Sequence, residues 1–191
     1  MALKVLGIYG SPRAGGNSDL LLREALRGAA EAGATVEELF LRELDIAPCL
    51  GCGSCAKTGK CIQMDDMQMI YPELESSDRL IIASPVFFYT VTAQLKAMID
   101  RCQALWSKKF YLNQISPPEI TGRKGFLLSV AATKGPKVFD CSVVVVRIFL
   151  ESIGVRFEGY LGYRRIDGKG EILSHPTALA EAFEAGKRLA R

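Results

Sequence analysis

The sequence predicts one α/β domain in which helices cover both faces of a parallel sheet. Short apolar segments with the composition of buried strands alternate along the chain with helical patterns. Such alternation is typical of parallel strands joined by right-handed helical crossovers. The chain has 191 residues, 49% of them hydrophobic, which suits a single core. We therefore expect residues 1–191 to fold as one domain.

The order of the expected elements follows the hydrophobic pattern. The strands are expected at Lys4–Tyr9, 35–41, 79–84, Lys124–Ala131 and 155–162. After the first strand, Asn17 or Ser18 can cap a helix whose apolar spacing continues to Gly33. Further helices are expected at 92–106, 140–153 and 176–191. The 140–153 segment has strand-like valines, but its apolar residues keep helical spacing, so we interpret it as a buried helix.

Charge and cysteine usage exclude several classes of protein. The net charge is +3, from 24 basic and 21 acidic residues scattered along the chain, so we expect no nucleic acid and no anionic membrane as partner. No apolar run approaches the ~20 residues that span a bilayer, and the N-terminal residues lead into a strand instead of a signal peptide. We therefore expect a cytoplasmic protein, whose thiols stay reduced. Cys102 and Cys141 lie in apolar helical patterns, and we expect them to be core residues.

The loop after the first strand has the composition of a phosphate-binding loop. Glycines and short polar side chains predominate there, and a helix N-terminus follows. The candidate phosphate contacts are Ser11, Arg13, Gly16, Asn17 and Ser18. The loop lacks the glycine patterns of dinucleotide sites and nucleoside triphosphatases, so a mononucleotide phosphate fits better. An ordinary βα turn with a good N-cap is the alternative.

The same residues carry a resemblance to a known family. The run Gly7-Ile8-Tyr9-Gly10-Ser11-Pro12-Arg13, followed by Asn17-Ser18, resembles the phosphate loop of the NADPH-dependent FMN reductase family. The resemblance covers nearly the whole chain. It implies a flavodoxin-like fold, a three-layer sandwich with a five-stranded parallel sheet of order 2-1-3-4-5. FMN is then expected beyond the carboxyl ends of the strands, at the switch point.

Two later loops are candidates for contacts with the flavin ring. The run Pro85-Val86-Phe87-Phe88-Tyr89 places a rigid turn and aromatic side chains after the third strand, where a flat ring would find apolar contacts; simple core packing is the alternative. In the family this run resembles the P-V-Y turn that lies against the flavin, with Phe87 in place of the usual tyrosine. After the fourth strand, Ala132, Thr133 and Gly135 stand where related proteins have paired glycines.

Four cysteines form a compact group in residues 48–62. Cys49, Cys52, Cys55 and Cys61 have the spacing C-x2-C-x2-C-x5-C, with small residues between them. Compact thiolate runs of this kind hold iron–sulfur clusters, and a tetrahedral zinc site is an alternative. Structural zinc more often uses two separated cysteine pairs, so we favour one 4Fe–4S cluster. A group of free thiols without metal is the remaining interpretation.

The cysteine spacing, preceded by Pro48 and followed by Asp65-Asp66-Met67, resembles the iron–sulfur flavoprotein branch of the same family. In that branch the cluster lies near the flavin of a neighbouring subunit, so the resemblance implies a homodimer or homotetramer. Asp65 and Asp66 themselves are expected to cap the helix that follows. The downstream residues Gln94-Leu95-Lys96 and Asp100-Arg101 also match the family pattern.

The expected function is that of an FMN-dependent oxidoreductase. Electrons would pass between NAD(P)H or ferredoxin, a 4Fe–4S cluster, FMN and a small-molecule acceptor, and no side chain need act as an acid or base. The lone histidine, His175, leaves no Ser-His-Asp candidate, which argues against most hydrolase mechanisms. A cluster-free NAD(P)H-dependent FMN or quinone reductase, a flavodoxin-like electron carrier and a cysteine redox sensor are the alternatives.

Overall fold

The computed structural model describes residues 2–191 and confirms the predicted α/β sandwich. Its five strands form one parallel sheet of order β2-β1-β3-β4-β5, the order that the family resemblance implied. The strands are β1 (Lys4–Tyr9), β2 (Thr35–Phe40), β3 (Arg79–Pro85), β4 (Lys124–Ala131) and β5 (Arg156–Arg164). The chain passes from β1 to β2 on one side and then returns to β3 on the other, which creates a switch point between β1 and β3.

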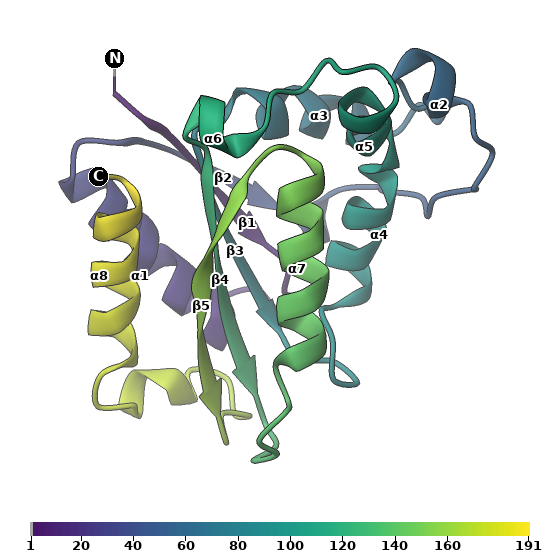
Figure 1. Ribbon diagram of the computed structural model, residues 1–191. Coiled ribbons are helices and arrows are strands. Elements are labelled where there is room, and N and C mark those ends of the chain that lie inside the picture. The colour runs from purple at the N-terminus through teal and green to yellow at the C-terminus, as the bar shows by residue number, and fades with distance from the viewer. Residues whose placement is uncertain (1) are drawn as a thin grey trace.

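Helices cover both faces of this sheet (Figure 1). One face carries α1 (Asn17–Glu31) and α8 (Ala178–Leu189), which pack against each other. The helices of the opposite face are α3 (Met67–Ser76), α4 (Ala93–Arg101), α5 (Gln103–Phe110) and α7 (Asp140–Ser152). Short turns complete the order: η1 (Leu41–Glu43), α2 (Cys55–Thr58), α6 (Pro118–Thr121) and η2 (Glu171–Ser174). No helix in residues 2–191 is long and apolar enough to cross a membrane.

The apolar core lies in two layers because the central strands are buried on both faces. Along β1, Leu6 and Ile8 join the cluster under α3, α4, α5 and α7, whereas Val5 and Tyr9 join the cluster under α1 and α8. Successive side chains of a strand point to opposite faces, so both sets must be apolar. This explains why β1, β3 and β4 appear in the sequence as continuous apolar runs.

The contact between α1 and α8 is unusually close because glycines face it. A Cβ at Gly28 would lie 2.0 Å from the Phe183 carbonyl oxygen, and one at Gly186 would lie 1.8 Å from the Ala25 carbonyl oxygen. No side chain fits at either position. The two glycines therefore set the position of α1 and of the loop from which it starts.

Two of the expected helices differ in detail. The 92–106 segment is not one helix, because Cys102, with φ −68° and ψ 3°, separates α4 from α5. The Cys102 amide is shared between the carbonyls of Met98 and Ile99. The 140–153 segment is confirmed as a helix, α7, but it is not buried all round. Val144 and Ile148 on its outer side are 49% and 54% exposed. Cys141, in the first turn of α7, is also exposed, so the expectation that it is a core residue is wrong, whereas Cys102 is buried as expected.

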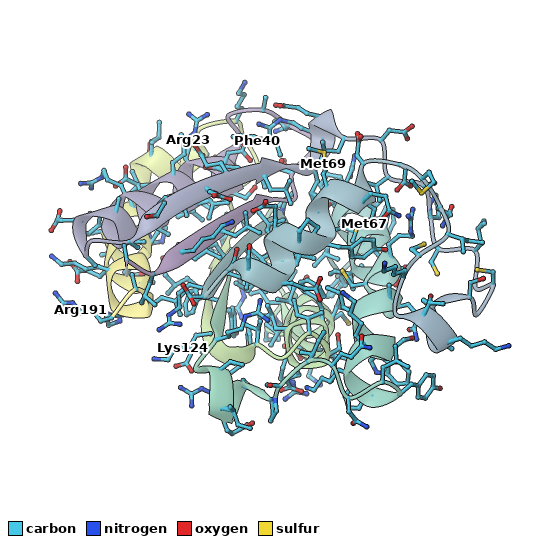
Figure 2. The ribbon with its side chains drawn as sticks, turned by 90° about the horizontal axis from the view of Figure 1, so that it is seen from above. Arg23, Phe40, Met67, Met69, Lys124 and Arg191 are labelled. Carbon is cyan, nitrogen blue, oxygen red and sulfur yellow. The ribbon has the colours of Figure 1, made fainter. Side chains whose placement is uncertain are left out.

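The connection between β2 and α3 stands away from the sandwich. Figures 1 and 2 show this segment and α2 projecting from the edge of the molecule, and the side chains drawn in Figure 2 include sulfur atoms along the segment. Here the chain is neither strand nor long helix, since the glycines at 51, 53 and 59 all take positive φ. The predicted cysteine group thus lies on a separate feature beside α4 and α5.

Candidate functional site

A pocket of about 370 Å³ lies at the carboxyl edge of the sheet, beside the switch point. It brings together most of the predicted cofactor residues: Ser11, Arg13, Gly16, Asn17, Ser18, Pro85, Val86, Phe87 and Ala132. It also includes residues that the sequence analysis missed: Pro12, Val130, Ile166 and Asp167. Ile166 and Asp167 follow β5, and the Ile166 amide continues the sheet by donating to the Ala131 carbonyl at 3.1 Å. The segment that holds Ile166 and Asp167 has an ordinary loop composition, so the sequence offers no signal that identifies these two residues as pocket residues.

The phosphate-loop candidates are held in a tight turn before α1. The Arg13 amide donates to Ser11 Oγ at 3.1 Å, and the Gly16 amide donates to the Arg13 carbonyl at 3.2 Å. Gly16 is the N-cap of α1, and no side chain caps this end. The first amides of a helix have no intrahelical partner, so this end of α1 presents free N–H groups and the positive end of the helix dipole to an anion.

The expectation that Asn17 or Ser18 caps α1 is wrong. Both residues lie within the first turn of the helix and are buried. The Asn17 side chain instead reaches the segment after β5: its Nδ2 donates to the Gly168 carbonyl at 2.8 Å, and its Oδ1 accepts the Ile172 amide at 3.2 Å. Asn17 therefore holds the Ile166–Asp167 wall of the pocket against the phosphate loop.

A buried ion pair supports the phosphate loop from below. Asp19 Oδ2 accepts the Gly15 amide and the Arg42 guanidinium, both at 3.0 Å. The Asp19 side chain is fully buried, and its Oδ1 has no partner. Burial raises the pKa of Asp19 above its ordinary value, although the Gly15 amide and Arg42 oppose this shift. Nothing in the local sequence links Asp19 to Arg42.

The aromatic run after β3 forms a strained turn at the rim of the pocket. The amides and carbonyls of Phe87 and Thr90 bond to each other at 2.9 and 3.1 Å, which closes a two-residue turn. Phe88 and Tyr89, at its tip, take φ values of 47° and 63°, a region that costs non-glycine residues energy. Phe88 is fully exposed. Strain of this kind persists where a fold or a function requires it.

Four of the predicted contact residues do not line the pocket. Phe88 and Tyr89 stand at its rim, and Thr133 and Gly135 lie in the neighbouring loop after β4. Tyr89 and Gly135 are close, since a Cβ at Gly135 would lie 3.2 Å from the Tyr89 hydroxyl. The Tyr89 side chain therefore connects the two loops that flank this side of the pocket.

The four predicted metal ligands line a second hollow, of about 560 Å³, between the cysteine loop (residues 48–62) and helices α4 and α5. Cys49 and Cys52 are exposed, Cys55 and Cys61 are half-buried, and all are free thiols. Within residues 2–191, no three side chains of His, Cys, Asp or Glu lie close enough to form a metal site. The thiols thus surround one hollow without converging on one point. Their donor set suits an iron–sulfur cluster or zinc, and the left-handed glycines between them allow the loop to change its path.

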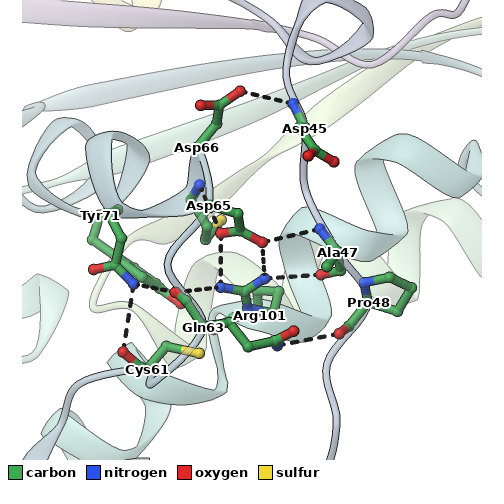
Figure 3. A network of polar contacts seen from close by, with 11 residues as sticks. Asp45, Ala47, Pro48, Cys61, Gln63, Asp65, Asp66, Tyr71 and Arg101 are labelled. Carbon is green, nitrogen blue, oxygen red and sulfur yellow. Dashed lines mark hydrogen bonds and ion pairs between the residues drawn. The ribbon is translucent and has the colours of Figure 1, made fainter.

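The two ends of the cysteine loop are tied together (Figure 3). Asp65 Oδ2 accepts the Ala47 amide at 3.0 Å, and Asp66 Oδ2 accepts the Asp45 amide at 2.8 Å. Asp66 is the N-cap residue of α3, but its side chain does not cap that helix, whereas Asp65 Oδ1 accepts the Met67 amide at 3.1 Å. The expected capping role is therefore found only at Asp65.

Arg101, at the end of α4, completes this tie. Its Nη1 donates to the Ala47 carbonyl at 2.9 Å, and its guanidinium forms a bidentate ion pair with Asp65 at 2.5 and 2.9 Å. Arg101 holds the pKa of Asp65 below its ordinary value. Burial would raise the pKa of the Cys61 thiol, but the Gln63 amide and the nearby Arg101 guanidinium favour the thiolate and outweigh burial, so that pKa is lowered. The apolar spacing of residues 92–106 in the sequence did not indicate that Arg101 would be buried.

His175 belongs to neither hollow. Its Nδ1 accepts the amides of Thr177 and Ala178 at 3.4 and 3.2 Å, and its ring packs edge-on against Tyr163. The lone histidine is therefore a structural residue at the start of α8.

Comparison with known proteins agrees with this geometry. The model of the NADPH-dependent FMN reductase family matches residues 3–139, which include the phosphate loop, the cysteine loop and the turn after β3. The chain belongs to this family. Membership makes the protein a flavin-dependent oxidoreductase. The segment after β5 that closes the pocket lies beyond the matched residues.

Several similar proteins are named iron–sulfur flavoproteins. An iron–sulfur flavoprotein of Archaeoglobus fulgidus is 34% identical over 194 aligned positions, covering 98% of this chain and 83% of that protein. An iron–sulfur flavoprotein of Methanocaldococcus jannaschii is 45% identical over 103 positions, covering 54% of this chain and only 53% of that relative's length. Among solved structures, an NAD(P)H:quinone oxidoreductase from Methanothermobacter marburgensis has a TM-score of 0.75 at 17% identity over 100% of this chain and 98% of that one. This last likeness shows the fold alone.

Proposed function

We propose that the protein binds FMN in the pocket at the carboxyl edge and a 4Fe–4S cluster in the cysteine loop, and transfers electrons between them. The observation that carries this proposal is the pocket at the switch point, which joins a helix N-terminus to an apolar turn. The first part suits a phosphate group and the second suits a flat ring. The cofactor would supply the redox chemistry, and the chain would bind and orient it.

The pocket residues divide into two sets by chemistry. Ser11, Ser18 and the first amides of α1 would donate hydrogen bonds to the phosphate, with Arg13 adding a cation at the exposed side. Pro85, Val86 and Phe87 would provide the apolar surface beside the ring. Phe87 carries no hydroxyl, so polar contacts at that edge would come from the backbone.

The cysteine loop would hold the cluster through Cys49, Cys52, Cys55 and Cys61, after the exposed end of the loop closes. A bound cluster would supply one-electron transfer, which complements the one- or two-electron chemistry of a flavin. The two hollows share no residue. Helix α4 begins after the turn that follows β3 and ends at Arg101, which lines the cysteine hollow, and its nine residues span about 13 Å.

NAD(P)H or a ferredoxin would be the electron donor, and a small molecule the acceptor. The names of the iron–sulfur flavoprotein relatives support the cluster, and the family description supports NADPH. We further propose a homodimer or homotetramer in the cytoplasm, where a neighbouring subunit would bring its cluster near this FMN.

A cluster-free FMN or quinone reductase is the second candidate. The observation that favours it is the separation of the thiols, because no metal-binding group is assembled within residues 2–191. In that case the cysteines would bind zinc or remain thiols, while the flavin pocket and its chemistry would be unchanged.

One experiment tests both candidates. The protein is purified without oxygen, and its flavin, iron, sulfide and zinc contents are measured together with direct oxidation of NADPH and NADH. FMN with about four irons per chain supports the cluster-bearing enzyme, and loss of iron in Cys52→Ser but not in Cys141→Ser locates the cluster. FMN without iron supports the second candidate. Failure to bind FMN contradicts both candidates. FMN binding without iron and without any NAD(P)H oxidation contradicts the second candidate, whereas FMN and iron without NAD(P)H oxidation leaves ferredoxin as the donor of the first.

A further inference from the structure

Arg101 is the most buried cation of the described chain, and it lies beside the cysteines. Its side chain is fully buried, and the residue as a whole is 1% exposed. A buried charge needs partners for all of its donors. Nη1 and Nη2 have them, in Asp65 and the carbonyls of Ala47 and Gln63. The Nε–H of Arg101 is buried and has none.

The partners of Arg101 stand at the two ends of the cysteine loop. Ala47 precedes this loop, and Gln63 and Asp65 follow it, so one side chain from α4 holds both ends (Figure 3). The Gln63 side chain adds a cross-link by donating to the Pro48 carbonyl at 3.2 Å. The loop is therefore closed at its base, whatever its exposed end contains.

Arg101 also lines the hollow that the four cysteines surround, together with Cys61 at the closed base. The cysteine loop contains no carboxylate, and Asp65 is committed to the bidentate ion pair. Asp100 also lines the hollow, but its carboxylate pairs with Lys96 at 2.7 Å. A centre held by thiolates is anionic, and one-electron reduction adds one more negative charge. Hydrogen bonds donated to the sulfur ligands stabilise that added charge and raise the reduction potential.

We propose that Arg101 is the positioning residue of the cysteine loop: it clasps the ends of the loop through Asp65, and its free Nε–H donates to the Cys61 ligand of the cluster. This inference rests on the proposed function. It adds a role for a side chain that is not itself a metal ligand. Loss of the Nε–H lowers the midpoint potential of the cluster, even where a positive charge is kept.

Arg101→Lys is the test variant, because lysine keeps the charge but has no Nε–H in the guanidinium position. Arg123→Lys is the matched control. Arg123 is half-buried and donates to the carbonyls of Ser77, Ile153 and Leu74, and it lies outside the cysteine hollow. The midpoint potential of the cluster is measured by EPR-monitored redox titration of the anaerobically purified full-length protein. We expect Arg101→Lys to lower this potential and Arg123→Lys to leave it unchanged. An unchanged midpoint in Arg101→Lys with full iron content overturns the inference.

A second measurement needs no variant. Reduced wild-type protein labelled with ¹⁵N at arginine Nε should show a ¹⁵N hyperfine coupling to the cluster by pulsed EPR, and this coupling should be absent when only lysine is labelled. A cluster without arginine coupling overturns the role of Arg101 and leaves the proposed function standing. Wild-type protein that assembles no cluster contradicts the cluster itself, and the inference falls with it.

Discussion

Asn17, the first residue of α1, bonds to Gly168 across 151 positions of the chain, with its Nδ2 2.8 Å from the Gly168 carbonyl oxygen. The same side chain accepts the Ile172 amide. This side chain joins the loop before α1 to the segment after β5, although nothing in the sequence links the two. Together they form one wall of the flavin pocket.

This bond should make FMN affinity depend on Asn17 through the segment after β5, in addition to any contact that Asn17 makes as a lining residue of the pocket. Asn17→Ala removes two hydrogen bonds of about 1 kcal/mol each and frees the segment after β5. We expect the dissociation constant of FMN, measured by quenching of the flavin fluorescence, to rise roughly tenfold. Ser174→Ala, on the exposed side of η2, should leave the affinity unchanged. Equal affinities in Asn17→Ala and the wild type would show that the segment after β5 does not contribute to the site.

Asp19 should stabilise the fold through its ion pair with Arg42. Asp19→Ala leaves the half-buried Arg42 and the Gly15 amide without their acceptor, so we expect the free energy of unfolding to fall by about 3 kcal/mol. Asp19→Asn keeps an acceptor oxygen and should lose less. Urea unfolding measures both, with the exposed Glu184→Ala as the control, for which a change within about 0.5 kcal/mol is expected. A loss in Asp19→Ala no larger than in the control would contradict the role of the pair.

Substitutions in the turn at Phe88 and Tyr89 should have opposite effects on stability and on activity. Asn-Gly is the preferred pair for a turn with two positive φ values, so Phe88→Asn/Tyr89→Gly should raise the free energy of unfolding by about 1–2 kcal/mol. The same change removes both aromatic rings from the rim of the pocket, and we expect kcat/KM for a quinone acceptor to fall. Phe88→Ala keeps the strain and removes one ring, so it should lower activity without the gain in stability. A stabilised double variant of full activity would show that the rings are not used.

Much of the fold follows from local chemistry. The parallel sheet could be predicted because strands buried on both faces must be apolar throughout, as Leu80, Ile81 and Ile82 are in β3. The glycines and short polar residues after β1 predicted which loop would line the first pocket, although the expected capping was wrong. The cysteine spacing predicted one group of four thiols within a short segment, and the structure shows all four around the second hollow; their binding of a metal stays a prediction.

The remaining features depend on contacts between distant residues, which leave no periodic pattern. Arg101 and Asp65 are 36 positions apart. In a helical wheel for residues 92–106, nothing about the position of Arg101 indicates that it is buried or that it pairs with Asp65. The break at Cys102 is equally invisible, because its apolar neighbours keep helical spacing on both sides. Asn17 was misinterpreted because a residue that is a good N-cap is also a good donor and acceptor for another loop.

The glycines between α1 and α8 give a prediction about the fold itself. Gly186→Ala would place a methyl group 1.8 Å from the Ala25 carbonyl oxygen, so the helices must separate. We expect a loss of about 3 kcal/mol of unfolding free energy, measured by urea denaturation. Gly168→Ala is the matched control, since its added methyl group would come no closer than 3.6 Å to Glu171. Similar stabilities for the two variants would mean that the helix pair can move apart without cost.

The ion pair between Asp65 and Arg101 should make stability depend on pH in the acid range. Arg101 holds the pKa of Asp65 below its ordinary value of 3.8, so the folded protein favours the ionised carboxylate. The contribution of the pair is therefore fully present above pH 3.8 and is lost as the pH falls through the lowered pKa. A double-mutant cycle of Asp65→Asn and Arg101→Met isolates this contribution, because other carboxylates cancel in the differences.

We expect the coupling energy from this cycle to be about 3 kcal/mol at neutral pH, since each single variant leaves a buried partner unpaired. It should stay constant down to the ordinary pKa of aspartate and then decline toward zero as Asp65 is protonated. Unfolding by urea in metal-free buffer, at a series of pH values, measures it without any contribution from a bound cluster. A coupling energy that rises with acid would require a raised pKa at Asp65, which would contradict the bidentate pair. A coupling near zero at neutral pH would mean that the cysteine loop is held at its base by its backbone bonds alone.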